Sequence, residues 1–277
     1  MNEVVAVDTA LLAELDRIND DGRGSQKQDG ISFPILKVNY SKIDKNNNKV
    51  TKGVFTINHP DGNLYAESVW FRPLLQTFKW QNYDFDNNEM IVETIEVRNI
   101  FTEEPIDSKG TLRCGKPTAK LMTEKDKEKF KNVSFSRIVR GLIKAEMKDA
   151  KGKTHSIENL PVVMFLKGSN RDGIENEYFR KLPSGEHMRD HWVNMKIEER
   201  SNGSVDYYVI HYVADMDERL VMNQPTVETI QVITNQIEEK NKAIRDQYTE
   251  ALRNNNLDNS AIDALQDALG QELKDAS

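Results

Sequence analysis

The sequence of 277 residues contains a single cysteine, Cys114. One thiol cannot close an intramolecular disulfide, and it cannot supply the ligands of a thiolate zinc cluster. The first 20 residues carry acidic side chains where a secretory signal would carry basic ones. We therefore expect a protein of the reducing cytoplasm.

Long apolar runs and glycine-rich phosphate loops are also missing. No segment approaches the roughly 20 consecutive apolar residues that a membrane-spanning helix needs, and the longest candidates, such as residues 160–166, have the length of a strand. Neither GxxxxGK[ST] nor GxGxxG occurs, which argues against phosphate-loop enzymes and dinucleotide-binding folds. We expect no membrane association and no cofactor.

Groups that could support catalysis or bind a metal are few. His187 and His191 have a spacing that suits a helical metal site, but no third ligand is evident. Cys114 has no histidine partner that the sequence identifies. The acidic residues within 215–218 could chelate magnesium, so a metal-dependent nuclease stays an alternative. Our expectation is a non-enzymatic protein with no catalytic residue and no metal site.

Charge is distributed unevenly along the chain. The 38 basic and 45 acidic residues give a net charge of -7, which excludes a polycation that coats nucleic acid by overall charge. Residues 109–153 nevertheless carry 14 basic and 5 acidic side chains, whereas residues 1–30 and 220–277 are acidic. The basic middle of an acidic chain therefore predicts an anionic partner.

Hydrophobic periodicity divides the chain into three parts. Residues 1–30 predict a short helix followed by a flexible linker, and residues 31–215 alternate with the period of β-strands. Residues 216–277 form an acidic region in which apolar residues recur at helical spacing after Pro225, through Leu252, with a further short helix near the end. The predicted fold is a β-rich α+β protein whose central body has helical N- and C-terminal extensions.

Three hairpins are predicted inside the central body. In residues 193–212, alternating segments flank Asn202 and Gly203, which tolerate the positive φ of a tight turn. Similar patterns predict hairpins across residues 133–166 and 35–57. Several strands joined by hairpins favour an antiparallel barrel or sandwich.

Basic and aromatic side chains are interleaved in and before the basic segment. The basic candidates for phosphate contact are Arg72, Arg113, Lys116, Lys120, Lys129, Lys131, Arg137, Arg140 and Lys144, and the aromatic candidates for base stacking are Trp70, Trp80 and Phe135. A cationic groove with aromatic faces is typical of proteins that bind single strands without sequence preference. The alternative is that the aromatic residues belong to the core and the lysines to an ordinary solvated loop.

Residues 109–168 also carry a family resemblance. The segments RCGKP, RIVRGLI and ENLPVVMFLKG, with VWFRPLLQTFKWQNYD upstream, resemble the central part of bacteriophage-encoded single-stranded DNA-binding proteins. The resemblance implies an OB-like antiparallel barrel that coats single-stranded DNA during phage replication, recombination or transcription in the host cytoplasm. It implies that Arg113, Lys116, Arg137 and Arg140 contact phosphates and that Trp70, Trp80 and Phe135 stack on bases.

The resulting functional hypothesis is non-catalytic binding of single-stranded DNA. We expect the acidic C-terminal region to contact phage or host replication and transcription proteins, or to form a homo-oligomer. A phage structural or assembly protein that oligomerises through its C-terminal helix is the first alternative, and a metal-dependent nuclease is the second.

Overall fold

The computed structural model describes residues 33–254 except 45, 60–61, 85–86, 88, 104, 110–131 and 204. The strands are β1 (Lys37–Val38), β2 (Phe55–His59), β3 (Gly62–Ala66), β4 (Ser68–Asp84), β5 (Glu89–Glu93), β6 (Val133–Asp149), β7 (Thr154–Leu166), β8 (Val193–Ser201) and β9 (Asp206–Ala214). The helices are α3 (Gly168–Glu177), η2 (Phe179–Lys181), η3 (Met188–Asp190) and α4 (Gln224–Asn254). The predicted N-terminal helix and the last short helix lie outside the described residues.

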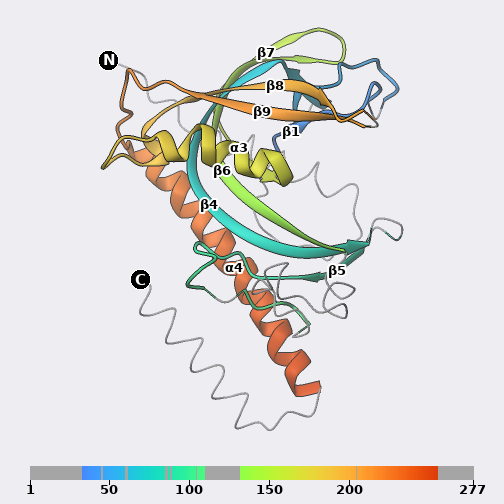
Figure 1. The fold of residues 1–277 in the computed structure, drawn as a ribbon, viewed down its shortest axis with the longest axis vertical. Helices are drawn as coiled ribbons and strands as arrows, with labels where there is room; N and C mark the ends of the chain where they lie inside the picture. The colour runs from blue at the N-terminus through green and yellow to red at the C-terminus, as the bar shows by residue number, and fades with distance from the viewer. Residues whose placement is uncertain are drawn as a thin grey trace. The chain divides into compact units, whose positions relative to one another are not determined.

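The nine strands that the structure describes belong to one sheet (Figure 1). Its strand order is β1-β2-β3-β6-β4-β8-β9, with β5 paired to β4 and β7 paired to β6. The strand pairs are antiparallel. Within the described ranges β1 and β9 are not paired with each other, so the sheet is not closed into a barrel. The predicted β-rich α+β fold with a long C-terminal helix is confirmed, and the predicted barrel closure is wrong.

The described chain divides into two compact units. The first comprises the described parts of Met1–Gln76 and Ser136–Gln236, and the second those of Thr77–Phe135 and Ile237–Ser277. Strands β4 and β6, each 17 residues long, pass from one unit to the other, and so does α4.

Alternation of side chains builds the core of the first unit. On β4, Val69 and Phe71 are at most 1% exposed, and on β6, Ile143 and Met147 are fully buried. These residues share one hydrophobic cluster with side chains of β2, β3, β7, β8 and β9. Because successive strand residues point to opposite faces, the residues that alternate with these core residues, such as Trp70 and Lys144, lie on the other face of the sheet, which is called the outer face below.

The hairpins follow the predicted turns. Strands β8 and β9 pair from Val193 opposite Ala214 to Ser201 opposite Asp206, and Gly203 in the turn has a φ of 90°. Strands β6 and β7 pair with one irregularity between Ile143 and Ala145. On β9 the residues that face the core are Tyr208, Ile210 and Tyr212. Apolar residues occupy both faces of this strand, so periodicity alone does not identify its buried side.

Helix α3 lies beside β9, the last strand of the sheet (Figure 1). The side chain of Asn170 accepts a hydrogen bond from the Ile210 N–H at 2.8 Å and donates one to the Tyr208 carbonyl at 3.2 Å. Glu177, two turns further along, accepts the Tyr212 N–H at 2.9 Å. Side chains of the helix therefore occupy main-chain groups that an edge strand would otherwise offer to another strand.

The second unit has its own core. Phe78, Val97 and Ile244 lie in one buried cluster, so α4 contributes to this core. Asn241 of α4 accepts the Glu96 N–H at 2.7 Å and donates to the Glu96 carbonyl at 2.8 Å. A side-chain amide thus takes the place of a neighbouring strand at this position.

None of the helices that the structure describes is both long and apolar enough to cross a membrane.

Candidate nucleic-acid interface

Five of the predicted phosphate-binding residues lie outside the described residues: Arg113, Lys116, Lys120, Lys129 and Lys131. The candidate interface therefore comprises the other predicted residues and their neighbours in space.

The three predicted arginines that the structure describes are buried. Arg72, Arg137 and Arg140 are 5%, 8% and 5% exposed, respectively. The guanidinium of Arg137 is 2.8 Å from the Glu175 carboxylate and lies over the ring of Phe179. A buried guanidinium cannot reach a phosphate without a rearrangement, so these arginines are not part of the candidate surface.

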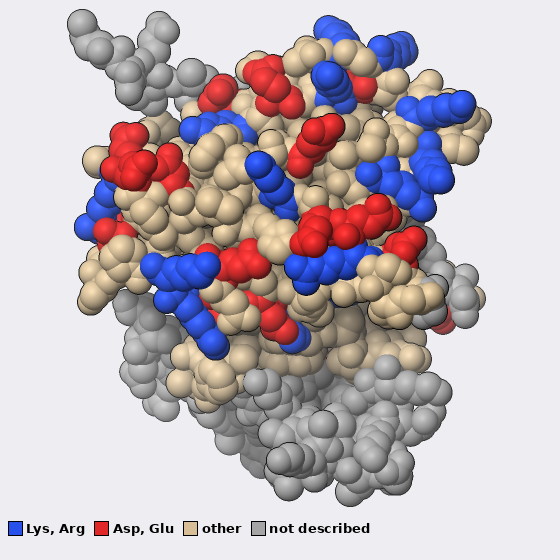
Figure 2. Space-filling model, turned by 45° about the horizontal axis from the view of Figure 1, so that its top comes forward, with Lys and Arg blue, Asp and Glu red and all other residues tan. Residues whose placement is uncertain are grey.

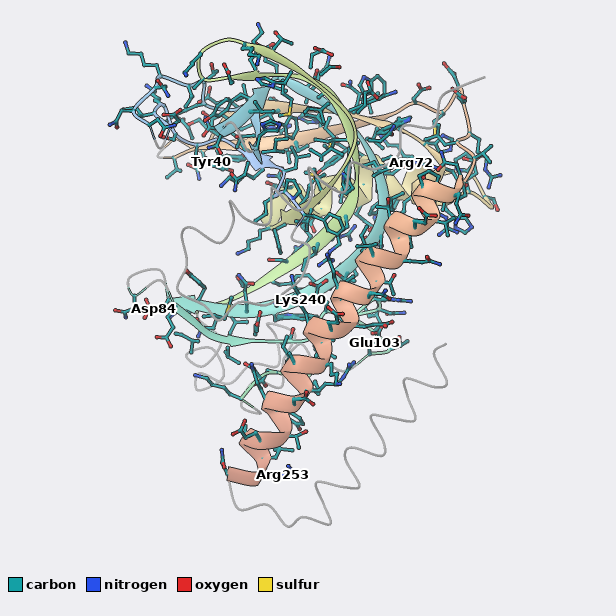
Figure 3. All side chains as sticks on the ribbon, turned by 180° about the vertical axis from the view of Figure 1, so that it is seen from behind. Tyr40, Arg72, Asp84, Glu103, Lys240 and Arg253 are labelled. Carbon is teal, nitrogen blue, oxygen red and sulfur yellow. The ribbon has the colours of Figure 1, made fainter. Side chains whose placement is uncertain are left out.

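Arg72 holds backbone segments together. Its Nε donates to the Arg189 carbonyl at 2.8 Å, and Nη2 donates to the Val221 carbonyl at 3.4 Å. Figure 3 shows Arg72 near the first turn of α4. Burial lowers the pKa of this guanidinium, and the nearby Asp190 carboxylate opposes that shift. The arrangement gives Arg72 a structural role.

Trp80 and Phe135 contribute to the packing of the second unit. Both are half-buried. Their ring centroids are 4.5 Å apart, and Phe135 stacks on Phe78 at 5.8 Å with an angle of 10° between the ring planes. At least part of their aromatic surface is therefore occupied by each other and by the core.

Trp70 and Lys144 come together on the outer face of the first unit. Trp70 lies between the core residues Val69 and Phe71, and Lys144 follows the buried Ile143. The ammonium of Lys144 is 5.4 Å from the ring centroid of Trp70 and 4.6 Å from that of Trp192. Both distances are within the range of a cation–π interaction.

Trp192 is the member of this cluster that the sequence analysis missed. It directly precedes Val193, which is fully buried at the start of β8. The alternation that places Val193 and Met195 in the core places Trp192 on the opposite face. The sequence signal for Trp192 was therefore an aromatic residue next to a strand, at a position that alternates with the buried residues of that strand.

Tyr65 and Lys148 extend the outer face toward β3. They are directly opposite each other in the β3–β6 ladder, so their side chains lie on the same side of the sheet. Leu64 and Ala66, on either side of Tyr65, are in the core. The outer face thus carries Tyr65, Trp70 and Trp192 together with Lys144 and Lys148.

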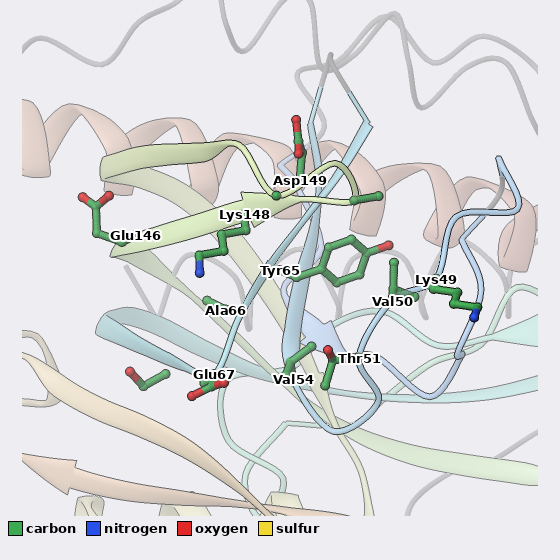
Figure 4. A pocket seen from close by; sticks show the side chains of 13 residues that line it. Lys49, Val50, Thr51, Val54, Tyr65, Ala66, Glu67, Glu146, Lys148 and Asp149 are labelled. Carbon is green, nitrogen blue, oxygen red and sulfur yellow. The ribbon is translucent and has the colours of Figure 1, made fainter.

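A pocket of about 510 Å³ opens beside Tyr65. It is lined by residues 49–51, Val54, residues 65–68, residues 146 and 148–150, and Gly152. Figure 4 shows the Tyr65 ring inside it, with Lys148 and Asp149 on one side and Lys49 and Val50 on the other. This space is called the Tyr65 pocket below.

Exposed lysines surround the Tyr65 pocket. Lys49, Lys52, Lys148, Lys151 and Lys153 are all exposed, and none of them forms an ion pair with another described residue. In the view of Figure 2, several basic side chains gather along one edge of the molecule, and basic and acidic side chains are interspersed over the rest of the face. The lining also includes Glu67, Glu146 and Asp149, so the positive charge at the pocket comes from these five exposed lysines, which are called the lysine rim below.

The Asp149 carboxylate stabilises the turn between β6 and β7. It accepts the N–H groups of Lys151 at 2.8 Å and Lys153 at 2.9 Å. These hydrogen bonds lower the pKa of Asp149, and the one from Lys153 has the largest effect. They outweigh desolvation, which raises the pKa. The carboxylate therefore fixes the backbone from which Lys151 and Lys153 project.

Among the residues described, no three His, Cys, Asp or Glu side chains gather in a way that could hold a metal ion. His191 is 1% exposed, and its two ring nitrogens face the Asp215 carbonyl at 3.0 Å and the Glu186 carboxylate at 2.6 Å. The two histidines of the EHMRDH segment thus do not share a site, because the ring nitrogens of His191 are already engaged.

Comparison of the chain with protein-family models, with curated proteins and with solved structures finds no match.

Proposed function

We propose that this protein binds single-stranded DNA on the outer face of its first unit, without catalysis. The observation that carries the proposal is the group formed by Trp70, Trp192 and Lys144, beside the Tyr65–Lys148 pair and its ring of exposed lysines. Binding on the face of an open sheet does not require the barrel closure that the family resemblance implies. A role in phage DNA replication, recombination or transcription belongs to the same proposal.

Lysines and aromatic rings have separate tasks in this proposal. Lys49, Lys148 and their neighbours attract the phosphates, and each phosphate contact on a single strand contributes about 0.7 to the slope of log K against log salt. The exposed faces of Tyr65 and Trp70 receive bases by stacking, which contributes about 1–3 kcal/mol per base. Lys144 fixes the two tryptophan rings, because its ammonium lies close to both.

Salt-dependent binding of a fluorescent oligo-dT of about 30 nucleotides tests the proposal. We expect tight binding at low salt that duplex DNA of the same length does not displace. The double variant Lys49→Ala, Lys148→Ala removes two rim charges, so its slope against log salt becomes shallower by about 1.4. An oligo-U of the same length measures the preference between DNA and RNA.

A charge-matched control separates local contact from net charge. Lys181→Ala combined with Lys242→Ala also removes two exposed lysines, and neither lines the Tyr65 pocket. We expect the control to retain the wild-type slope. Absence of binding at low salt, or equal slopes for the two double variants, would contradict the proposed function.

A further inference from the structure

The ladder between the chain before β1 and β7 stops after one bridge. Ile35 and Val163 form a parallel bridge, in which the Leu36 N–H donates to the Val163 carbonyl at 2.9 Å and the Val163 N–H donates to the Pro34 carbonyl at 3.0 Å. Continuation would require hydrogen bonds from Phe165 N–H to the Leu36 carbonyl and from Val38 N–H to the Phe165 carbonyl. Neither bond is formed between these described residues.

A pocket of about 420 Å³ occupies the place where the ladder stops. Residues 36–41 line one side and residues 164–166 the other, and Asn170 and Ile210 complete the lining. This space is called the β1–β7 pocket.

Main-chain donors and acceptors of both segments face the β1–β7 pocket. Asn39 directs its N–H to the Val54 carbonyl on the β2 side, so the preceding residue, Val38, directs its main-chain groups to the other side. Val163 uses both of its groups toward residues 34–36, so Phe165, two residues further, faces the same way. The pocket therefore presents N–H and C=O groups next to each other.

Two exposed aromatic side chains belong to the lining. Tyr40 is 57% exposed and Phe165 is 45% exposed. The ring of Tyr40 makes an edge contact with Tyr208 at 5.4 Å, which restrains it at the mouth of the pocket; Figure 3 shows its place in the first unit. Lys37, exposed and within the lining, adds a cation.

We propose that the β1–β7 pocket receives a nucleobase of the bound single strand. Its volume accommodates one base, its aromatic side chains offer stacking surfaces, and its main-chain groups can pair with the adjacent donors and acceptors on a base edge. Lys37 is placed to contact the neighbouring phosphate. This inference rests on the proposed function, because the base arrives as part of the same strand.

The two pockets lie next to each other. Asn39 lines the β1–β7 pocket, and Val54 lines the Tyr65 pocket. The two residues are joined by the hydrogen bond from Asn39 N–H to the Val54 carbonyl at 2.8 Å. A strand held by the lysine rim thus has to cross only the two-stranded ribbon of β1 and β2 to place a base in the β1–β7 pocket.

Single substitutions at the aromatic lining test the inference with the full-length protein and the same oligo-dT. We expect Phe165→Ala and Tyr40→Ala each to weaken binding by about 5- to 160-fold, the effect of losing one stacked base. The slope against log salt should stay at the wild-type value, because no phosphate contact is removed. Tyr40→Phe and Phe165→Tyr keep a ring and should retain most of the affinity.

An oligonucleotide with abasic sites and a matched aromatic control complete the experiment. Phe101 is 84% exposed and lines neither pocket, so Phe101→Ala should bind as the wild type does. On an oligonucleotide composed of abasic sites, the difference between wild type and Phe165→Ala should disappear. If wild type binds oligo-dT and the lysine variant changes the slope, but Phe165→Ala and Tyr40→Ala bind normally, the base pocket is refuted and the proposed function stands. If wild type binds no single strand, both are refuted.

Discussion

Gly141 of β6 is the position where a single added methyl group should be most damaging. A Cβ atom built on Gly141 would lie 2.2 Å from the carbonyl oxygen of Arg72 and 2.6 Å from Cε2 of Phe71. Real Cβ contacts essentially never fall below 3.0 Å. The first obstacle is backbone of the neighbouring strand β4, and the second is a ring that is fully buried. Neither can move aside at low cost.

The size of the effect follows from this geometry. Overpacking a core ordinarily costs about 1–3 kcal/mol and occasionally more. Because β4 and β6 have to separate locally to admit the methyl group, we expect Gly141→Ala to cost about 3 kcal/mol. That is a large part of the roughly 5–15 kcal/mol that stabilises a typical domain. It lowers the ratio of folded to unfolded protein by roughly 160-fold.

Urea unfolding, followed by circular dichroism and tryptophan fluorescence, measures this difference. Gly173→Ala in α3 is the matched control, because its Cβ would lie 3.5 Å from the nearest atom, the Ile210 carbonyl oxygen. An ordinary contact and the higher helix propensity of alanine should leave that variant as stable as wild type or about 1 kcal/mol more stable. Wild-type stability of Gly141→Ala would refute the reasoning.

Two further predictions concern buried polar groups near α3 and η3. Asp190→Asn should destabilise the protein by about 1–2 kcal/mol at pH 7, because the buried carboxylate accepts the His187 N–H at 3.1 Å and pairs with Arg219 at 2.8 Å. Although burial alone raises the pKa of Asp190, these partners lower it below its ordinary value. The carboxylate therefore stabilises the protein fully above about pH 4, and this stabilisation is lost as the pH falls through the lower pKa of the native state. The urea midpoints of wild type and variant should converge in acid, and a difference that stays constant with pH would contradict the stabilising role of the Asp190 carboxylate. Tyr178→Phe should lower the free energy of unfolding by about 1–2 kcal/mol in the same assay, because the hydroxyl donates to the Met188 carbonyl at 2.6 Å. Burial raises the pKa of Tyr178, so an ultraviolet titration in which every tyrosine of the folded protein ionises near pH 10 would contradict the burial of this hydroxyl.

Local patterns predicted most of the elements. The hairpin around Asn202 and Gly203, the β6–β7 hairpin and the helix after Pro225 depend on turn chemistry and on periodicity within one segment, and all three are confirmed. Barrel closure depends on whether the first and last strands meet. No local pattern encodes that pairing, which explains why it was wrong.

The candidate site could be predicted only in part, for a related reason. Trp70 and Lys144 were identified from their residue types, and both lie on the outer face. The burial of Arg72 and Arg137 depends on partners far away in the sequence, such as Glu175 for Arg137 and the carbonyls of Arg189 and Val221 for Arg72. A basic residue in a strand has the same pattern whether its partner is a phosphate or a distant carboxylate. Only the folded topology distinguishes the two.

The contact between α3 and β9 makes the protection of the sheet edge conditional on the order of folding. Asn170 and Glu177 serve three main-chain positions of β9, but only when the helix is formed and docked. A chain in which the β8–β9 hairpin forms before α3 packs would expose a strand edge rich in tyrosine and valine, which another chain could extend. The period of greatest risk for aggregation is therefore the interval before helix docking, and conditions that delay docking should lower the yield of refolded monomer without changing the stability of the native protein.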